Sequence, residues 1–262
     1  MTAQLLQSAA LATYRHPVTQ RFLRTRIGSA TFVRAYDVYK EFVEAPGIHA
    51  LARRIPPQTW VVDIGANIGF FTERFAKWAS GDGRVIAVEP DAHNVRLLKQ
   101  RLARRAITSV DIHQAAAAEF NGTIFLQHNP DHPGDHRISD RGEVVACITI
   151  DDVVERAGNP IVSFIKIDTQ GSERRVLQGA KKTLQRCRPA LFIEVDDRAL
   201  RQFGTTAVEL LAELASLEYR FYQISRSGKE TPISREGAMT ALLSAERGYL
   251  DLLCVHAQSS QP

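Results

Sequence analysis

The sequence predicts an α/β fold built on a mostly parallel sheet. After residue 57, short β-rich runs alternate with amphipathic helical patterns, and a glycine-rich turn joins the first run to the first helix. Two further β-rich runs close the chain, with no convincing helix after the second. Alternating strands and helices are typical of parallel sheets. A sheet that ends on such a pair of strands commonly has an antiparallel last strand.

The pattern also locates the individual elements. The strands expected in the parallel part of the sheet are residues 60–64, 85–89, 111–114, 164–168 and 191–195. Helical spacing of apolar residues predicts helices over about 69–79, 91–105, 173–186 and 205–217. The runs YRFYQI at 219 and YLDLLCV at 249 predict the closing strands.

Two segments lie outside the repeating pattern. Residues 1–57 show helical spacing interrupted by Pro17, Gly28 and Pro46, so we expect an N-terminal cap of short helices ahead of a main domain over residues 58–258. Between the third and fourth strands, TIFLQH at 123 and VVACITI at 144 predict a β-hairpin around the polar loop 129–142.

The composition limits the class of protein. No apolar stretch reaches the roughly 20 residues that span a bilayer, and the first residues lack the basic start of a signal peptide. Three widely spaced cysteines indicate neither a disulfide framework nor a zinc site. We therefore expect a cytoplasmic protein without a bound metal. Residues 1–58 carry eight Lys or Arg against three acids, a bias compatible with an anionic substrate, a membrane surface, nucleic acid or solvated helix faces.

The turn VVDIGANIGFF, residues 61–71, indicates a bound nucleotide or nucleoside. Gly65 and Gly69 allow the backbone to turn sharply between the first strand and the first helix. Ala66 and Asn67 stand where a dinucleotide site needs a glycine beside the pyrophosphate. The carboxylate of Asp63 also opposes a phosphate and suits a cationic ligand. NAD is therefore disfavoured at this turn.

A second acid narrows the identity of the ligand. Glu89 ends the second strand about 20 residues after the turn, where a carboxylate can accept hydrogen bonds from ribose hydroxyls. S-adenosylmethionine (SAM) contains a ribose and an ammonium but no phosphate. The turn, the spaced acid and the strand order together predict SAM as the cofactor.

Several segments resemble the FkbM-type SAM-dependent O-methyltransferases. They are VVDIGANIGFFTERFA, RVIAVEPDAHNVRLLKQRL, ITIDDVV, FIKIDTQGSERRVLQGA and PALFIEV, in this order over about residues 60–196. The KID-x-x-G-x-E segment followed by VL-x-GA is the most distinctive of them. Many members carry a glutamate where this chain has Gln170, so one carboxylate is lost and a metal site is less expected.

The resemblance implies the class I SAM-methyltransferase fold, a Rossmann-like seven-stranded sheet with an antiparallel last strand. It also implies methylation of a hydroxyl on a saccharide, glycolipid or glycosylated or polyketide natural product. The residues that it places around SAM are Asp63, Gly65, Asn67 and Gly69 at the methionine end, Glu89 at the ribose, and Ala116 and Ala117 at the adenine.

A hydroxyl acceptor needs a group that takes its proton, which directs the search to acids and histidine near the carboxyl edge of the sheet. Asp168, which ends the fourth strand, is the first candidate for catalysis. Glu194 near the end of the fifth strand and His136 in the polar loop are the others. Helix capping by Asp168, a buried structural acid at Glu194 and a solvated loop histidine are the alternatives. The residues expected to contact the acceptor are Asp135, Arg137 and Gln170.

Two other functions stay open. The basic N-terminal segment would suit an RNA or protein methyltransferase. However, neither Asn-Pro pair forms the N-P-P-aromatic motif of amino-group methylation and no Pro-Cys pair is present, so no nucleic-acid partner is expected. The third function is a non-catalytic SAM-fold module that docks on a partner. A homodimer and peripheral membrane contact through the basic helices are also compatible with the sequence.

Overall fold

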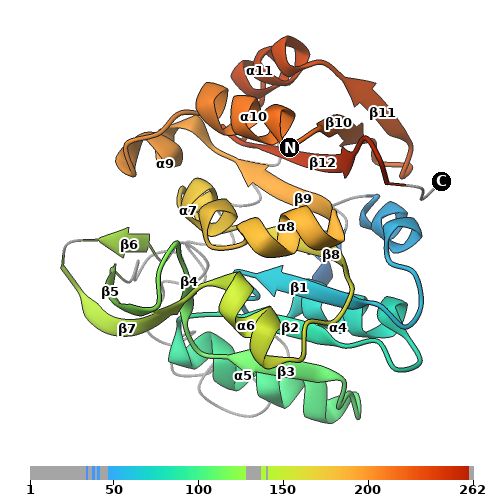
Figure 1. Ribbon diagram of the computed structural model, residues 1–262, viewed down its shortest axis with the longest axis vertical. Helices are drawn as coiled ribbons and strands as arrows, with labels where there is room; N and C mark the ends of the chain where they lie inside the picture. Colours follow the sequence, from blue (N-terminus) through green and yellow to red (C-terminus); the bar gives the residue numbers. More distant parts are fainter. Residues whose placement is uncertain are drawn as a thin grey trace.

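A central sheet with helices on both faces organises the chain. The computed structural model describes Arg34, Asp37, Val38, Lys40 and Glu41, residues 47–127, the backbone of 137–139, and residues 141–259. Within these residues an eight-stranded sheet carries the helices, and a four-stranded sheet stands beside it (Figure 1). The predicted α/β fold with a mixed sheet is confirmed. Among the described helices, none is long and apolar enough to cross a membrane.

The main sheet has the predicted parallel part and antiparallel closing strand. Its strands are β1 (Trp60–Ile64), β2 (Val85–Val88), β3 (Val110–His113), β8 (Val162–Ile167), β9 (Ala190–Val195), β10 (Tyr219–Ile224), β11 (Glu230–Ile233) and β12 (Leu250–His256). Their order is β11-β10-β12-β9-β8-β1-β2-β3. The strands from β9 to β3 pair in parallel, and β12 runs antiparallel between β9 and β10. The prediction of seven strands was wrong by one, because β11 folds back along β10 as an added antiparallel edge strand.

The helices differ more from the prediction. They are the 3-10 helix η2 (Ile48–Arg54) and the α-helices α4 (Phe70–Ala79), α5 (Ala92–Arg104), α6 (Ile150–Arg156), α7 (Glu173–Gln178), α8 (Lys181–Cys187), α9 (Asp197–Gln202), α10 (Ala207–Ser216) and α11 (Arg235–Leu243). Helices α6, α9 and α11 were not predicted. The expected helix over 173–186 is two helices, because the chain breaks at Gly179. A Cβ there would lie 2.0 Å from the backbone oxygen of Ala118.

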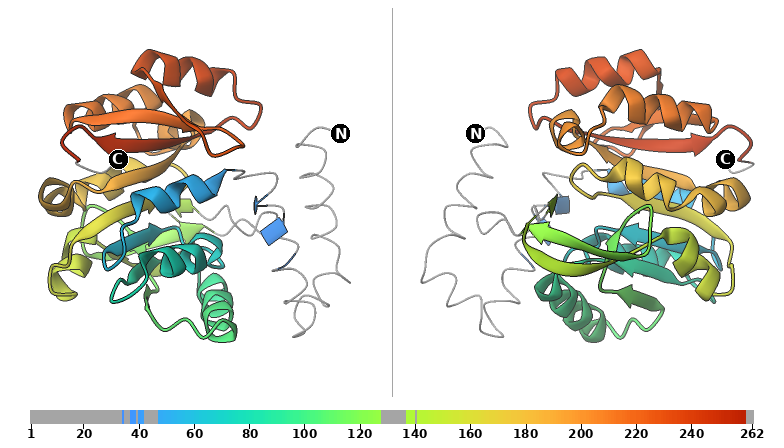
Figure 2. Two further views of the ribbon diagram at one scale, coloured as in Figure 1. Left: turned by 90° about the vertical axis from the view of Figure 1, so that its right-hand side faces the viewer. Right: turned by 60° about the vertical axis from the view of Figure 1, so that its left-hand side comes forward.

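Alternating side chains along the strands separate two apolar cores. Helices η2 and α4 cover one face of the sheet with an aromatic cluster that includes Phe75 and Phe164. Helices α6, α7, α8, α10 and α11 cover the other face. Figure 2 shows these layers from the side. Asp63 and Lys166 lie side by side in register on the α4 face, two charged residues beside its aromatic cluster.

The small sheet contains the predicted hairpin and two additional strands. Its members are β4 (Ala116–Ala117), β5 (Gly122–Gln127), β6 (Arg137–Ser139) and β7 (Glu143–Ile148), in the order β4-β7-β5-β6. Strands β5 and β7 form the predicted antiparallel hairpin. Strand β6, which the sequence predicted as loop, pairs with β5, and β4 pairs with β7. The insertion is thereby tied to the main sheet just after β3.

Candidate active site

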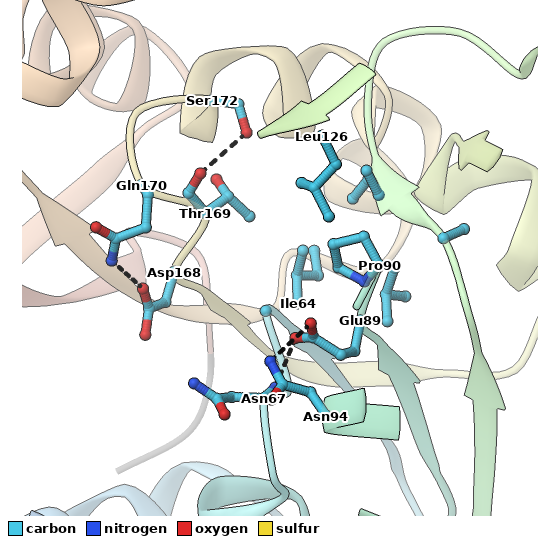
Figure 3. Close-up of a pocket in the computed structure, with 15 residues that line it drawn as sticks. Ile64, Asn67, Glu89, Pro90, Asn94, Leu126, Asp168, Thr169, Gln170 and Ser172 are labelled. Carbon is cyan, nitrogen blue, oxygen red and sulfur yellow. Dashed lines mark hydrogen bonds between the residues drawn. The ribbon is translucent and has the colours of Figure 1, made fainter. Parts of the chain in front are cut away.

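A hollow with an empty volume of about 610 Å³, open solvent included, lies where β1, β2 and β8 end. The chain adds β2 and β3 on one side of β1 and then crosses to β8 on the other side. Ligands bind α/β sheets in the crevice at such a switch point. The polar residues on its walls include Asn67, Glu89, Asn94, Asp168 and Gln170, and the apolar ones include Ile64, Val88, Pro90, Ala115, Ala116, Ala117 and Leu126 (Figure 3).

The turn below this hollow depends on glycine. Gly65 has φ 72°, and a Cβ on it would lie 1.9 Å from the backbone oxygen of Asp168, so the turn after β1 touches the turn after β8. Asn67 also has a positive φ, of 50°, and its own side chain accepts a hydrogen bond of 2.7 Å from the Ile68 N–H. Gly69 begins α4 with φ 85°, and a Cβ there would meet Leu98 of α5 at 2.3 Å. Gly69 therefore lies against α5 and does not line the hollow, contrary to expectation.

Glu89 is buried at the end of β2 with its carboxylate held by neutral donors. Its oxygens accept hydrogen bonds from the Asn67 N–H at 2.8 Å, the Asp91 N–H at 3.0 Å and the Asn94 side-chain amide at 3.2 Å. Figure 3 shows the hydrogen bonds that join the Glu89 carboxylate to Asn67 and Asn94. Burial raises the pKa of Glu89 to about 7, and these hydrogen bonds offset only part of that effect.

Asp63 does not line the hollow, although the sequence placed it at the cofactor. Its side chain is 0% exposed; one oxygen accepts a hydrogen bond of 2.5 Å from the Thr72 hydroxyl, and the other lies 3.7 Å from the Lys166 ammonium. Burial raises the pKa of Asp63 above its ordinary value. In this position Asp63 does not contact a cationic ligand in the hollow directly. Asp63 instead lies beside Lys166, under the turn.

Lys166, which was not predicted as a site residue, contacts both the Gly65 turn and Asp168, the candidate base. Its ammonium donates a hydrogen bond of 2.8 Å to the Gly65 carbonyl and lies 3.2 Å from Asp168 Oδ2. Burial alone would lower the pKa of Lys166, but Asp168 and Asp63 raise it. Burial alone would likewise raise the pKa of Asp168, whereas Lys166 holds it below its ordinary value. The pair is therefore a buried lysinium and a carboxylate.

A second, smaller hollow, with an empty volume of about 300 Å³ that includes open solvent, lies on the α4 side of the sheet. It is lined by Lys40, Phe71, Lys166, Ile167, Asp168, Phe192, Glu194 and Asp251. Asp168 thus belongs to the walls of both hollows. Glu194 faces Asp251 across the β9–β12 pair. Burial, followed by the charges of Asp168 and Asp251, raises the pKa of Glu194 well above its ordinary value.

Most of the predicted site residues whose side chains the structure describes lie at one of the two hollows. Gly65, Asn67, Glu89, Ala116 and Ala117 line the first hollow, and Glu194 joins Asp168 at the second. The Gln170 side-chain amide bridges those two acids, at 3.2 Å from Asp168 and 3.0 Å from Glu194. Asp135 and His136 lie outside the described residues. Arg137 is described only as backbone in β6.

Lys166, Asp251 and Asn94 were not predicted as site residues. Lys166 interrupts the apolar run FIKI and Asp251 interrupts YLDLLCV. A charged residue inside a buried strand is rare unless it has a partner, so these two interruptions were a usable signal. Asn94 lies on α5 and could have been noticed only from its position five residues after Glu89.

The first hollow has the chemistry that a nucleoside requires. Glu89 offers carboxylate oxygens that neighbouring N–H groups hold in place, as ribose hydroxyl donors need. Ala115, Ala116 and Leu126 form an apolar wall suited to a purine ring.

Comparisons with known proteins indicate the family of the chain. The sequence-family model of the FkbM methyltransferase domain matches residues 63–221 of this chain. The FkbM methyltransferase from Methylobacillus flagellatus is 22% identical with a TM-score of 0.50, over 76% of this chain and 43% of that one. This chain therefore spans less than half of that relative. A comparison with curated proteins gave no match.

More distant structures resemble the chain over most of its length. A SAM-dependent methyltransferase from Aquifex aeolicus is 12% identical, with a TM-score of 0.46 over 86% of this chain and 97% of that one. A protein from Streptococcus mutans solved with S-adenosylhomocysteine (SAH) is 11% identical, with a TM-score of 0.46 over 82% and 98%. Because the family model covers more than half of the sequence, the chain belongs to the FkbM methyltransferase family, with SAM as its cofactor.

Proposed function

We propose that the protein transfers the methyl group of SAM to a hydroxyl of a saccharide, glycolipid or glycosylated or polyketide natural product. The observation that carries this proposal is the position of Asp168, which lies on the walls of both hollows. A carboxylate at the junction of a cofactor site and an acceptor site can take the proton of a hydroxyl.

The first hollow would hold the cofactor. Glu89 would accept hydrogen bonds from the ribose hydroxyls, and the Ala115, Ala116 and Leu126 wall would cover the adenine. The backbone at Gly65 and Asn67 would border the methionine portion. When bound, SAM supplies an electrophilic methyl group on a sulfonium sulfur.

The second hollow would hold the acceptor. Phe71 and Phe192 offer apolar surface for the carbon skeleton of a polyol, and Asp168 and Glu194 offer hydrogen-bond partners for hydroxyl groups. Lys166 keeps Asp168 ionised, so this carboxylate is ready to accept a proton at neutral pH. As the new ether bond forms, the hydroxyl proton of the acceptor passes to Asp168. The products are a methyl ether and SAH.

A screen for acceptors tests this proposal. The purified protein is incubated with SAM and separate panels of monosaccharides, uronic acids, glycolipids, polyketides, RNA oligonucleotides and peptides, and SAH formation is measured. We expect turnover with a hydroxylated small molecule, loss of that turnover in Asp168→Asn, and retention in Asp82→Asn, a matched change at an exposed loop residue. Turnover confined to RNA or peptides, or none on any hydroxyl acceptor while SAM still binds, would contradict the proposal.

A further inference from the structure

The turn after β8 holds a residue in a strained conformation between the two hollows. Gln170 has φ 56°, a left-handed value that is uncommon outside glycine and asparagine. The buried Glu173 carboxylate fixes this turn: one of its oxygens accepts hydrogen bonds from the Thr169 N–H at 3.1 Å, the Thr169 hydroxyl at 3.1 Å and the Gly171 N–H at 3.0 Å. Strained residues that their surroundings hold in place concentrate at functional sites.

In this conformation the Gln170 side chain reaches two acids, Asp168 just after β8 and Glu194 on β9. Its Nε2 donates one hydrogen bond to Asp168 Oδ1 at 3.2 Å and one to Glu194 Oε1 at 3.0 Å. Figure 3 shows the Gln170 amide turned toward Asp168. A side-chain amide nitrogen carries two hydrogens, so both are used. The opposite orientation would set the amide oxygen against the ionised Asp168 carboxylate, which only accepts hydrogen bonds.

The charged groups around the two acids are not the same. Lys166 lies 3.2 Å from Asp168, on the β8 side. Glu194 faces Asp251 on β12, and Glu173 on α7 adds further negative charge near it. Lys40 acts on both acids and so does not distinguish them. Two carboxyl groups that share one site tend to hold a proton between them.

We propose that Gln170 is a positioning residue that holds Asp168 and Glu194 as an unequal pair, with Asp168 as the proton acceptor and Glu194 as its protonated neighbour. A neutral amide suits this task because it donates to both groups without adding charge. A carboxylate at position 170 would instead compete for the same proton. The inference rests on the proposed function, because it assigns the role of Asp168 in methyl transfer.

The first test is a carbon-13 NMR titration that needs no acceptor. Protein labelled at the side-chain carboxyl carbons of Asp and Glu is titrated as wild type, Gln170→Ala and Gln170→Glu, with Asp168→Asn and Glu194→Gln to assign the two signals. We expect wild-type Glu194 to titrate far above the usual range and Asp168 below it. Gln170→Ala should raise the Asp168 midpoint by about one pH unit, since a lost hydrogen bond to a charged group changes the equilibrium about tenfold.

Gln170→Glu should raise the Asp168 midpoint further, and Gln185→Ala on the exposed side of α8 should leave both midpoints unchanged. Circular dichroism establishes that each variant is folded. Unchanged midpoints of both acids in folded Gln170→Ala would overturn the proposal. So would a wild-type spectrum in which Glu194 is ionised while Asp168 holds the proton.

The second test uses the acceptor from the screen. Gln170→Ala should lower kcat, shift the acid limb of its pH profile by the same amount as the Asp168 midpoint, and change the Kd of SAM by less than about threefold. A lower kcat with an unshifted profile would overturn the positioning role. The titration and the screen are independent, so failure of the inference is distinguishable from failure of the proposed function.

Discussion

Glu89, which is buried, and Asp168, which is half-buried, lie at the same edge of the sheet on either side of β1, but their partners differ. Backbone and side-chain N–H groups hold Glu89, and burial raises its pKa to about 7. The Lys166 ammonium lies beside Asp168 and lowers its pKa. The charged or neutral neighbour, and not burial alone, therefore decides which acid stays ionised. Asp168 is thus suited to accept a proton, and Glu89 to bind hydroxyl donors in a pH-dependent way.

Removal of the charge at Asp168 should have the largest effect. Asp168→Asn keeps the shape of the side chain but cannot take a proton, so turnover on the acceptor should fall by about 10² to 10⁴-fold. The Kd of SAM, measured by titration calorimetry, should change by less than about threefold. Near-normal turnover in a folded Asp168→Asn protein would exclude this residue as the essential base.

Removal of Lys166, the cation beside Asp168, should chiefly lower the stability of the fold. Lys166→Met removes the nearest cation of the buried Asp63 and the half-buried Asp168, so the free energy of unfolding at pH 7 should fall by about 3–5 kcal/mol. The loss should shrink as the pH falls, because protonated carboxyl groups need no cation. Urea unfolding measures this effect.

Lys77→Met is the matched control for that measurement. Lys77 is half-exposed and pairs with Glu73 at 2.7 Å, and Glu73 keeps Arg101 as a partner. Its loss should cost less than about 1 kcal/mol. Equal unfolding midpoints for Lys166→Met and Lys77→Met would show that Lys166 is not the stabilising partner of Asp63 and Asp168.

The smallest expected effect concerns Glu89. If SAM binds the ionised form, a pKa of about 7 makes the Kd at pH 6 about tenfold larger than at pH 8. Glu89→Gln should weaken binding about tenfold at pH 8 and remove the pH dependence. Calorimetry on both proteins at both pH values measures this. A wild-type Kd that does not change with pH would contradict the conclusion that Glu89, unlike Asp168, titrates near neutral pH.

The raised pKa of Glu89 also makes the stability of the folded protein depend on pH, whether or not SAM is bound. The pKa of Glu89 is raised in the folded protein, so folded Glu89 binds more protons than unfolded Glu89 between about pH 4.5 and 7. Its contribution to stability therefore falls as the pH rises through this window. Glu89→Gln should lose that part of the pH dependence in urea unfolding, whether or not SAM is present.

Local patterns explain what could be predicted from the sequence. The parallel strands are apolar runs, and the Gly65 turn follows from steric limits on the backbone, so both are visible without a structure. Helix α6 was missed because it is short and directly follows the β-rich run of β7. Its N-cap, Thr149, accepts a hydrogen bond from the Asp152 N–H and was the available sign.

Long-range register explains what could not be predicted. Lys166 acquires its role only because β8 places it beside Asp63 and the Gly65 carbonyl. Asp251 reaches Glu194 only because the last strand inserts antiparallel beside β9. Long-range register also explains why the predicted position of Asp63 at the cofactor differs from the structure. The side of the sheet that a strand residue faces depends on its neighbours.

A crystal structure of the protein with bound SAH would test the roles assigned to Glu89 and Asp168. We expect the ribose hydroxyls to contact the Glu89 carboxylate, the adenine to lie against Ala115, Ala116 and Leu126, and the sulfur to lie closer to Asp168 than to Glu89. An adenosyl group bound outside the first hollow, or a sulfur that faces away from Asp168, would contradict the assignment of the two hollows.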